Sequence, residues 1–275
     1  MEPIIKWVGG KRQLLSEIKK YVPENIDKYY EPFIGGGAVL FEIAPENAVL
    51  GDMNPELINL YKVVKNKHLK LLVELEKHKV NNSEEYYYYV RGWDRNKDFC
   101  ELSDVTRAAR FIYLNKVCYN GLWRVNSKGE NNTPYGKYIN PSIYNKDSII
   151  EMHNYLRKNK VKILYGDFKK CVKKAVEGDF VYFDPPYAPI STTANFTSYA
   201  SEGFDVEDQV RLKKTCDDLS KRGVKFLLSN SNCEFIRELY KDYIIEIVEA
   251  NRAINSDAAK RGKVEEVLIR NYENC

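Results

Sequence analysis

Residues 181–189, with the sequence VYFDPPYAP, place a carboxylate, two prolines and an aromatic ring at the end of a short apolar strand. Proline holds φ at about −65° and has no N–H, so the turn after Asp184 is rigid and presents carbonyl oxygens. A carboxylate and a fixed carbonyl match the two donors of an –NH2 group, and Tyr187 offers a surface for stacking. The candidate catalytic residues are Asp184, Pro185, Pro186 and Tyr187, and their expected substrate is an exocyclic amine on a flat heterocycle.

Such an amine is a weak nucleophile, because its lone pair is conjugated with the ring. Two acceptors on its hydrogens favour a pyramidal nitrogen and localise the lone pair, so that the nitrogen can attack the methyl group of a sulfonium in line. This reaction needs no strong base before the attack and depends mainly on positioning and electrostatic preorganisation. A purely structural strand end is the alternative interpretation of the same residues.

A second group of candidates follows two earlier strands. Gly35, Gly36 and Gly37 come after a short strand, and Asp52 ends the next apolar stretch. In an open α/β sheet, ligands bind outside the carboxyl ends of the strands, where glycine permits close approach and an acid can accept ribose hydroxyls. The sequence GGGAVL lacks the third glycine of a dinucleotide-binding motif. S-adenosylmethionine, which has no phosphate, is therefore favoured over a dinucleotide, although a glycine turn also serves packing alone.

Three acidic positions could complete this cofactor site. Glu31 and Asp184 could face the positive part of S-adenosylmethionine, and Asp167 with Phe168 could bind and cover its adenine. The alternative interpretation of the last pair is a helix N-cap followed by a core phenylalanine.

The N-terminal stretch KWVGGKRQLL has the composition of an ordered loop that leads into a helix. Trp7 could stack on a ligand, and Lys11 could pair with a carboxylate. From the residues alone, a core tryptophan and a surface lysine are the preferred interpretation.

A parallel sheet would bring these strand ends to one edge. Strands and helices alternate over much of the chain, which indicates an α/β fold with a doubly wound, mostly parallel, Rossmann-like sheet. Later strands are expected at Val161–Phe168, Asp179–Asp184, Val224–Asn230, Ile244–Ala250 and Val264–Asn271, with helices at Val206–Arg222 and Glu234–Tyr240. No helix separates the last two strands, so an antiparallel hairpin at a sheet edge is expected.

Residues 57–164 interrupt this alternation. Helical periodicity, with Ser83 and Ser103 as expected N-caps, gives way at 118–141 to a segment with a hairpin turn at SKGE between two short strands, and a helix is expected at 146–158. The insertion holds 20 Lys and Arg against 11 Asp and Glu, a net charge of +9. We expect residues 1–56 and 165–275 to form the cofactor-binding catalytic domain, and 57–164 to form an inserted domain that meets a polyanion. A solvated lysine-rich surface is the alternative.

The composition restricts the class of protein. The chain has 275 residues, of which 44% are hydrophobic and 30% charged, as in a globular protein. It has no apolar run of about 18 residues and no signal-peptide pattern, so a cytoplasmic protein without a membrane span is expected. Its six cysteines include no C-x-x-C pair and it has three histidines, so reduced thiols and no metal site are expected.

Several motifs in chain order resemble those of the Dam/DpnM-type (α-group) DNA adenine N6-methyltransferases: KWVGGKRQLL, EPFIGGG, NGLWRVNSKGENNTPYGKY, DPPYAP, NFTSYASEGF and RGKVEEVLIRNY. The resemblance covers essentially the whole chain. It implies methyl transfer from S-adenosylmethionine to N6 of an adenine flipped out of double-stranded DNA. Asp184, Pro185 and Tyr187 would hold that adenine. Trp7 and Lys11 would contact the cofactor, which replaces the structural interpretation of the N-terminal loop.

The same resemblance assigns the insertion to DNA target recognition. Arg124 suits a bidentate contact with guanine, and Tyr119 would wedge into the base stack where the adenine leaves. Other base-edge contacts are expected from Asn120, Leu122, Pro134 and Tyr138, and an outer guanine contact from Lys6. The implied target is GATC, and no role follows for Trp123. Support of the fold is the alternative for any one of these residues.

Two further segments and three alternative functions complete the sequence-based expectations. Residues 188–204 are expected to close over cofactor and base as a loop, and 251–263 to be either a phosphate contact or a solvated hairpin tip. An RNA adenine methyltransferase, a DNA cytosine-N4 methyltransferase and a non-catalytic DNA-binding protein are the alternatives. A cognate restriction endonuclease could act in the same system without being a required subunit.

Overall fold

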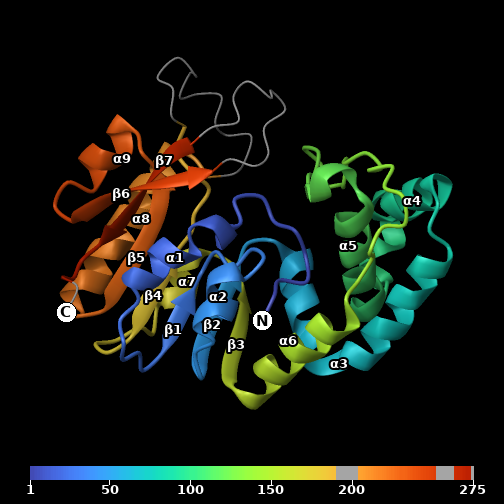
Figure 1. Ribbon diagram of the computed structural model, residues 1–275, viewed down its shortest axis with the longest axis horizontal. Helices are drawn as coiled ribbons and strands as arrows, with labels where there is room; N and C mark the ends of the chain where they lie inside the picture. The colour runs from blue at the N-terminus through green and yellow to red at the C-terminus, as the bar shows by residue number, and fades with distance from the viewer. Residues whose placement is uncertain (190–203, 252–262, 274–275) are drawn as a thin grey trace. The chain divides into compact units, whose positions relative to one another are not determined.

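The computed structural model describes residues 1–189, 204–251 and 263–273. Their strands form a seven-stranded sheet in the order β3-β2-β1-β4-β5-β7-β6 (Figure 1). The strands are β1 (Tyr29–Glu31), β2 (Asn47–Asp52), β3 (Lys160–Tyr165), β4 (Phe180–Phe183), β5 (Lys225–Ser231), β6 (Ile244–Asn251) and β7 (Lys263–Arg270). Strand β1 is parallel to β2 and β4, and β4 to β5, whereas β7 is antiparallel to β5 and β6. The predicted α/β class, mostly parallel sheet and terminal antiparallel hairpin are therefore confirmed.

The helices in the described residues agree with most of the sequence expectations. They are α1 (Leu15–Lys20), α2 (Ala38–Ile43), α3 (Pro55–Val80), α4 (Glu84–Arg91), α5 (Asp104–Val117), α6 (Lys146–Lys158), α7 (Phe168–Val172), α8 (Val206–Lys221) and α9 (Glu234–Leu239). Short 3-10 turns are η1 (Lys11–Gln13), η2 (Gly92–Arg95), η3 (Lys97–Glu101) and η4 (Tyr119–Gly121). Across the described part of the chain, no helix combines the length and the apolar character that spanning a membrane requires.

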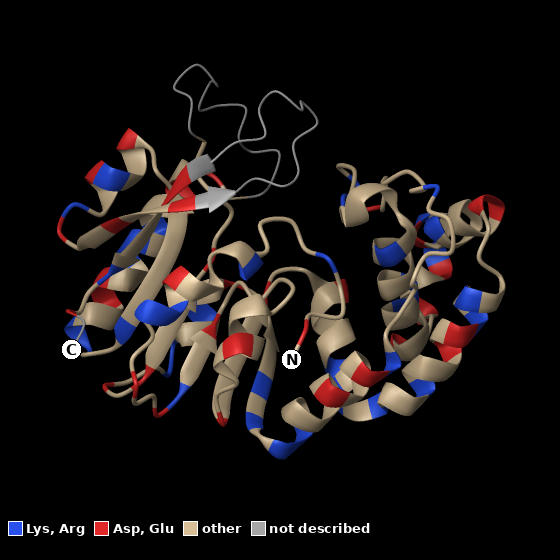
Figure 2. Ribbon diagram, in the orientation of Figure 1, with Lys and Arg blue, Asp and Glu red and all other residues tan. Residues whose placement is uncertain are grey.

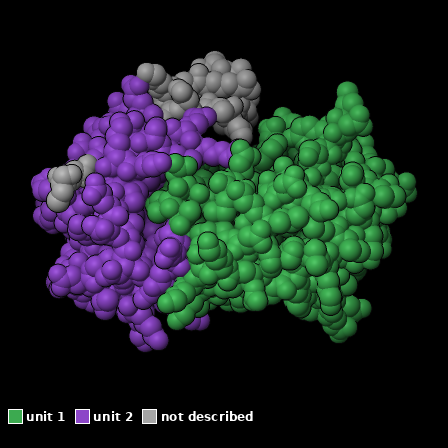
Figure 3. All heavy atoms as spheres, turned by 60° about the horizontal axis from the view of Figure 1, so that its bottom comes forward, with its two compact units in different colours: residues 1–11, 35–44, 52–165 green, residues 12–34, 45–51, 166–275 purple. Residues whose placement is uncertain are grey.

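The chain divides into two compact units (Figure 3). Unit 1 comprises residues 1–11, 35–44 and 52–165, and unit 2 comprises residues 12–34, 45–51 and 166–275. The segment 57–164 lies whole within unit 1, together with the N-terminal segment and the glycine turn. Basic and acidic residues are both present along the helices of unit 1 (Figure 2).

Capping residues set the helix boundaries of unit 1. Asn54 accepts hydrogen bonds from the first backbone N–H groups of α3. Ser83 and Ser103, the two N-caps that the sequence predicts, cap α4 and α5 in the same way. Helix α3 joins two stretches that have separate apolar patterns in the sequence, and a single non-helical residue, Lys67 (φ −140°), interrupts it. The buried guanidinium of Arg110 pairs with Asp94, with 2.8 Å between N and O.

Unit 2 holds the strands that lead to the acidic turn. All four residues of β4 are buried, as an inner strand of a parallel sheet requires. Helix α8 begins with a capping box between Asp205 and Asp208 and packs against β5. Because β7 lies between β5 and β6, the hairpin extends the sheet past β5 (Figure 1).

The expected hairpin strands around SKGE are not formed. In this fully described segment, only two isolated antiparallel bridges occur, Cys118 with Tyr135 and Val125 with Asn131. Side chains take the backbone groups that a ladder would use: Asp94 accepts from the Asn131 N–H, and Thr133 Oγ1 from the Arg124 N–H. The prediction of two short strands was therefore wrong, although the turn itself is present.

Candidate active site

The acidic turn begins directly after β4. Asp184 is half-buried, Pro185 is buried and Pro186 is exposed. The apolar strand carries the carboxylate to the carboxyl edge of the sheet, where ligands bind in open α/β folds. All four predicted catalytic residues lie in unit 2.

Polar side chains from α8 and β5 bond the turn. Gln209 Nε2 donates to the Pro186 carbonyl at 2.9 Å, the Ala188 N–H donates to Asn230 Oδ1 at 3.0 Å, and Ser231 Oγ donates to the Ala188 carbonyl at 2.5 Å. Gln209 therefore takes one of the two lone pairs of the Pro186 carbonyl, which makes the Pro185 carbonyl the candidate backbone acceptor beside Asp184 in the predicted amine site. The motif gave no signal for these partners, which lie 23 to 43 residues away in sequence.

Tyr187 is fixed at its far end. Its hydroxyl donates to Glu266 Oε2 on β7 at 2.7 Å. Burial, followed by the nearby carboxylates of Asp184 and Glu266, raises the pKa of Tyr187 well above its ordinary value. The hydroxyl therefore stays protonated and remains a donor, while the ring keeps one orientation.

Asp52 is the central acid of the glycine turn in unit 1. Its Oδ2 accepts from the Gly35 N–H at 3.2 Å, and its Oδ1 accepts from the Asn54 N–H at 2.9 Å. Burial raises the pKa of Asp52, and the backbone donors oppose that shift. Each oxygen of a carboxylate can accept more than one hydrogen bond, so the group retains capacity for hydroxyl donors.

The glycines of this turn are required by their surroundings. Gly35 (φ +47°) and Gly37 (φ +74°) are left-handed. A Cβ on Gly35 would lie 2.6 Å from Cδ1 of Trp7, and one on Gly37 would lie 2.6 Å from the hydroxyl of Tyr61. Gly36 faces Trp7 as well. The space that the glycines leave open is therefore filled, at least in part, by protein side chains.

The N-terminal loop is more buried than its composition suggests. Lys11 is only 5% exposed, and its Nζ donates to the Gly9 carbonyl at 2.7 Å. Lysine is rarely buried unless it is paired, so the surface alternative for this residue is wrong. The half-buried Trp7 lies against Phe111, with ring centroids 6.2 Å apart.

The open question about Trp123 has a structural answer. Its ring lies 4.1 Å from that of Phe111, the same ring that contacts Trp7. Trp123 thus packs residues 118–138, the predicted recognition segment, onto α5.

Two of the predicted cofactor residues in unit 2 carry structural contacts. Asp167 is the N-cap of α7: its Oδ1 accepts from the Lys169 N–H at 2.9 Å, and its Oδ2 accepts from Arg211 at 2.5 Å. Phe168 is buried, stacks on Phe33 at 5.6 Å and lies beneath the Arg211 guanidinium. The cap and the core phenylalanine of the alternative interpretation are present, and adenine binding stays a prediction.

Glu31, the other predicted cofactor residue of unit 2, is 2% exposed. It accepts a hydrogen bond from the Tyr29 hydroxyl at 2.7 Å. This contact fixes its carboxylate, and its role toward a cofactor also stays a prediction.

Several predicted DNA-binding residues come together in unit 1. The Asn120 N–H donates to the Tyr138 hydroxyl at 3.0 Å, and Lys6 Nζ lies 5.6 Å from the centre of the Tyr138 ring. The Tyr119 N–H donates to the Pro134 carbonyl at 2.9 Å. Thus residues from the N-terminal segment and from both ends of the recognition segment lie on one surface.

A buried asparagine that the sequence did not reveal pins Lys6 to this surface. Asn115 accepts from the Lys6 N–H and donates to the Lys6 carbonyl, both at 2.8 Å. It also donates to the Gly121 carbonyl at 3.2 Å. Arg124, by contrast, keeps an exposed side chain.

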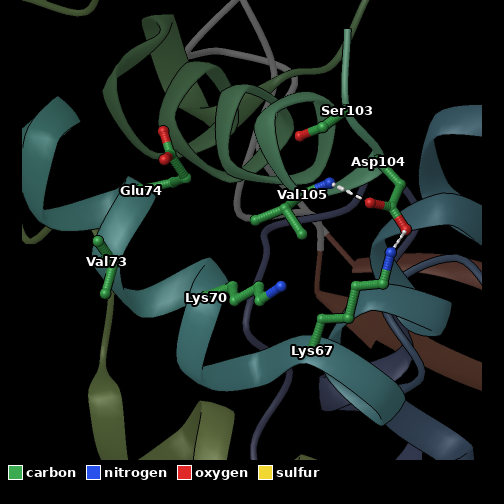
Figure 4. Close-up of a pocket in the computed structure, with 7 residues that line it drawn as sticks. All are labelled: Lys67, Lys70, Val73, Glu74, Ser103, Asp104 and Val105. Carbon is green, nitrogen blue, oxygen red and sulfur yellow. Dashed lines mark hydrogen bonds and ion pairs between the residues drawn. The ribbon is translucent and has the colours of Figure 1, made fainter.

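A separate hollow of about 390 Å³ lies on unit 1. Figure 4 shows its lining residues: Lys67, Lys70, Val73, Glu74, Ser103, Asp104 and Val105. None of the predicted site residues is among them, and Lys67 pairs with Asp104 across it. Within the described ranges, no cluster of His, Cys, Asp and Glu could hold a metal ion. Most of the expected closing loop (188–204) and of the basic segment (251–263) lies outside the described residues.

Comparison with known proteins gives a consistent picture. A family model described as D12 class N6 adenine-specific DNA methyltransferase matches residues 7–254. The chain is 48% identical to the type II methyltransferase M1.LlaDCHI of Lactococcus lactis subsp. cremoris, over 100% of this chain and 96% of that protein. It is 43% identical to the type II methyltransferase M.MjaIII of Methanocaldococcus jannaschii, over 99% of each chain. It is 34% identical to the DNA adenine methylase of Escherichia coli K12, over 96% of this chain and 93% of that protein.

Proposed function

The chain belongs to the D12 class N6 adenine-specific DNA methyltransferases, and from this premise we propose that it transfers a methyl group from S-adenosylmethionine to N6 of an adenine flipped out of double-stranded DNA, at GATC. The observation that carries the proposal is the turn after β4, where Asp184 is followed by a buried proline and by a tyrosine whose ring orientation is fixed. That arrangement suits an amino group on a planar ring.

The residues around Asp52 fit the proposed cofactor. The carboxylate is held by two backbone N–H groups and retains acceptor capacity, which matches the two hydroxyls of a ribose. S-adenosylmethionine, when bound, supplies a methyl group on a positively charged sulfur. Glu31 and Asp184 would provide negative charge toward it, and Trp7, Lys11 and the glycine turn would form further contacts.

The proposed role of the acidic turn is to prepare the nitrogen. The Asp184 carboxylate and the Pro185 carbonyl would each accept one N–H of the adenine amino group, which localises the lone pair on N6. Tyr187 would hold the ring by stacking. Flipping costs about a few kcal/mol, which this stacking offsets in part. The proton can leave after the transfer, so no strong base has to act first.

Recognition of the target is proposed to come from unit 1. Arg124 would read a guanine, and Tyr119 would fill the gap that the flipped base leaves. Asn120, Leu122, Pro134, Tyr138 and Lys6 would contact the flanking bases. We propose a cytoplasmic location because the proposed substrate is DNA. We also propose a cognate endonuclease in the same system, because two relatives are named type II methyltransferases.

The test is transfer of a labelled methyl group to matched substrates. We expect label on duplex GATC and on hemimethylated GATC, none on fully methylated GATC, and little on RNA or on duplexes in which cytosine replaces the target adenine. Label on RNA alone, or on cytosine alone, would overturn the proposal. Binding of DNA without any heat on titration with S-adenosylmethionine would favour a non-catalytic binder.

A further inference from the structure

The turn Pro185–Ala188 is bonded at four points by side chains from three elements. Gln209 on α8 holds the Pro186 carbonyl, Asn230 and Ser231 on β5 hold the N–H and the carbonyl of Ala188, and Glu266 on β7 holds the Tyr187 hydroxyl. Gln209, Asn230 and Ser231 are all buried, at 3%, 0% and 3% exposure. Together with Glu266 we name them the turn clamp.

The two amides of the turn clamp fix each other's orientation. Since Gln209 Nε2 donates to the turn, its Oε1 faces Asn230 and accepts from Asn230 Nδ2 at 3.2 Å. Asn230 Oδ1 in turn accepts from the N–H groups of Ala188 and Ser231, at 3.0 and 2.9 Å. Rotating either amide by 180° would oppose donor to donor or acceptor to acceptor, so one arrangement satisfies every group.

The turn clamp supplies what the prolines leave undetermined. Proline fixes its own φ but not its ψ, and the ψ of Pro186 sets the direction of its carbonyl and of Tyr187. Gln209 fixes that carbonyl, and Asn230 fixes the peptide unit that follows Tyr187 through the Ala188 N–H. The side-chain torsions of Tyr187 are fixed by its hydroxyl bond to Glu266. Each torsion that orients the stacking ring therefore has a specific partner.

We propose that Gln209 and Asn230, supported by Ser231 and Glu266, are positioning residues that hold the Pro185 carbonyl and the Tyr187 ring in the orientation that methyl transfer requires. This inference rests on the proposed function. Packing of α8 against β5 would not by itself require these two amides, because a well-packed apolar pair of similar size can replace a buried polar pair at little cost in stability. The bonds of the amides end on the turn, which is the part that needs fixed atoms.

The first experiment compares Gln209→Glu and Gln209→Met with the wild type. In Gln209→Glu, one carboxylate oxygen can still accept from Asn230, but the other replaces the amide donor and faces the Pro186 carbonyl oxygen, so that bond is lost. Gln209→Met removes both bonds with a side chain of similar size. We expect the single-turnover methylation rate to fall about 10- to 100-fold in each variant, as small misplacements of a site do. The KM for S-adenosylmethionine should stay within about twofold, because that part of the site is unchanged.

A matched control and a conservative rescue separate positioning from stability. Thr215 is buried on α8 and bonds only within its helix in the described structure, to the Arg211 carbonyl. Thr215→Val should lower the melting temperature without lowering the rate of the folded enzyme. Glu266→Gln, which keeps an acceptor for Tyr187, should retain most of the rate that Glu266→Ala loses.

A second measurement does not depend on catalysis. Prolines have no amide hydrogen and the first residue of a peptide has a free amine, so a peptide over residues 184–189 reports hydrogen exchange only at Tyr187 and Ala188. We expect protection of Ala188 in the wild type and its loss in Asn230→Leu and Gln209→Met, with Thr215→Val unchanged. Wild-type protein that shows this protection but methylates nothing would overturn the proposed function and leave the turn clamp standing. Active wild type with unchanged rates and unchanged exchange in the variants would overturn the turn clamp.

Discussion

The proposed catalytic turn at 184–188 and the proposed recognition segment at 118–138 are both irregular loops, but they are held in opposite ways. In the turn, the functional side chain of Tyr187 is itself bonded, and the amide and hydroxyl partners of its backbone are buried. In the recognition segment, the backbone is bonded, while Tyr119 stays 56% exposed and Arg124 exposed. Tyr87 and Arg91, for example, donate to the Thr133 carbonyl at 2.8 and 3.0 Å.

This difference fits what each loop is proposed to do. Chemistry at a nitrogen requires acceptor atoms that are placed before the substrate arrives, so mobility of the turn costs rate. Base reading requires side chains that can reach into a groove from a fixed register, so the backbone has to be rigid and the tips accessible. Both loops obtain rigidity from side chains distant in sequence rather than from a β-ladder.

The largest loss of methylation rate is expected from replacing the acidic residue of the turn, Asp184. Asp184→Ala removes one of the two proposed acceptors of the amine, and we expect single-turnover methylation to fall by about 10³-fold or more, in the upper range for a preorganised hydrogen-bonding group. Circular dichroism and the melting temperature should show a retained fold. Asp218→Ala, at an exposed position of α8, is the control, and a near-normal rate for Asp184→Ala would contradict the proposed mechanism.

A somewhat smaller effect is expected where the recognition backbone is anchored. Asp94 pairs with the buried Arg110 and accepts from the Asn131 N–H, both at 2.8 Å. Asp94→Ala leaves a buried guanidinium without its carboxylate, and we expect the free energy of unfolding to fall by about 3 kcal/mol. Chemical denaturation measures that loss, and DNA binding should weaken more than S-adenosylmethionine binding. Equal weakening of both ligands would argue against separate roles for the two loops.

At the exposed tip of the recognition segment, the effect should be on discrimination. Arg124→Ala should reduce the preference for GATC by about 1–3 kcal/mol at one base pair, with the other positions unaffected. Methylation of duplexes substituted at each position measures it. Lys128→Ala, at an exposed turn residue of the same segment, should weaken binding to all of these duplexes by the same factor. An unchanged preference for Arg124→Ala would exclude direct readout by this residue.

The elements that depend on local patterns could be predicted from the sequence. The helix expected at Val206–Arg222 agrees with α8 to within one residue at its end, and Ser83 and Ser103 cap the helices that the pattern predicts. The position of Asp184 directly after a buried strand follows from the same kind of pattern. Such features depend on neighbours three or four residues away, which one sequence displays.

The missed features depend on distant residues. Glu266 is 79 positions from Tyr187, and Asn115 is 109 positions from Lys6, so no spacing rule links them. The prediction of two short strands around SKGE was wrong for the same reason, since Asp94, 37 positions away, takes a backbone N–H that a ladder would use. The burial of Lys11 is likewise set by the fold around it rather than by its neighbours in the chain.

The smallest change in rate is expected from removing the hydroxyl of Tyr187 while its ring is kept. Tyr187→Phe keeps the stacking surface and removes only the bond to Glu266, so we expect the single-turnover rate to fall by less than about tenfold, against about 100-fold or more for Tyr187→Ala, which also removes the stacking. Because burial and the nearby carboxylates raise the pKa of Tyr187 well above its ordinary value, the hydroxyl stays protonated at neutral pH. The pH–rate profile of Tyr187→Phe should therefore have the shape of the wild-type profile at a lower level. A profile that loses an inflection would mean that the hydroxyl exchanges a proton during the reaction, and the difference between the two loops would then be one of chemistry as well as of rigidity.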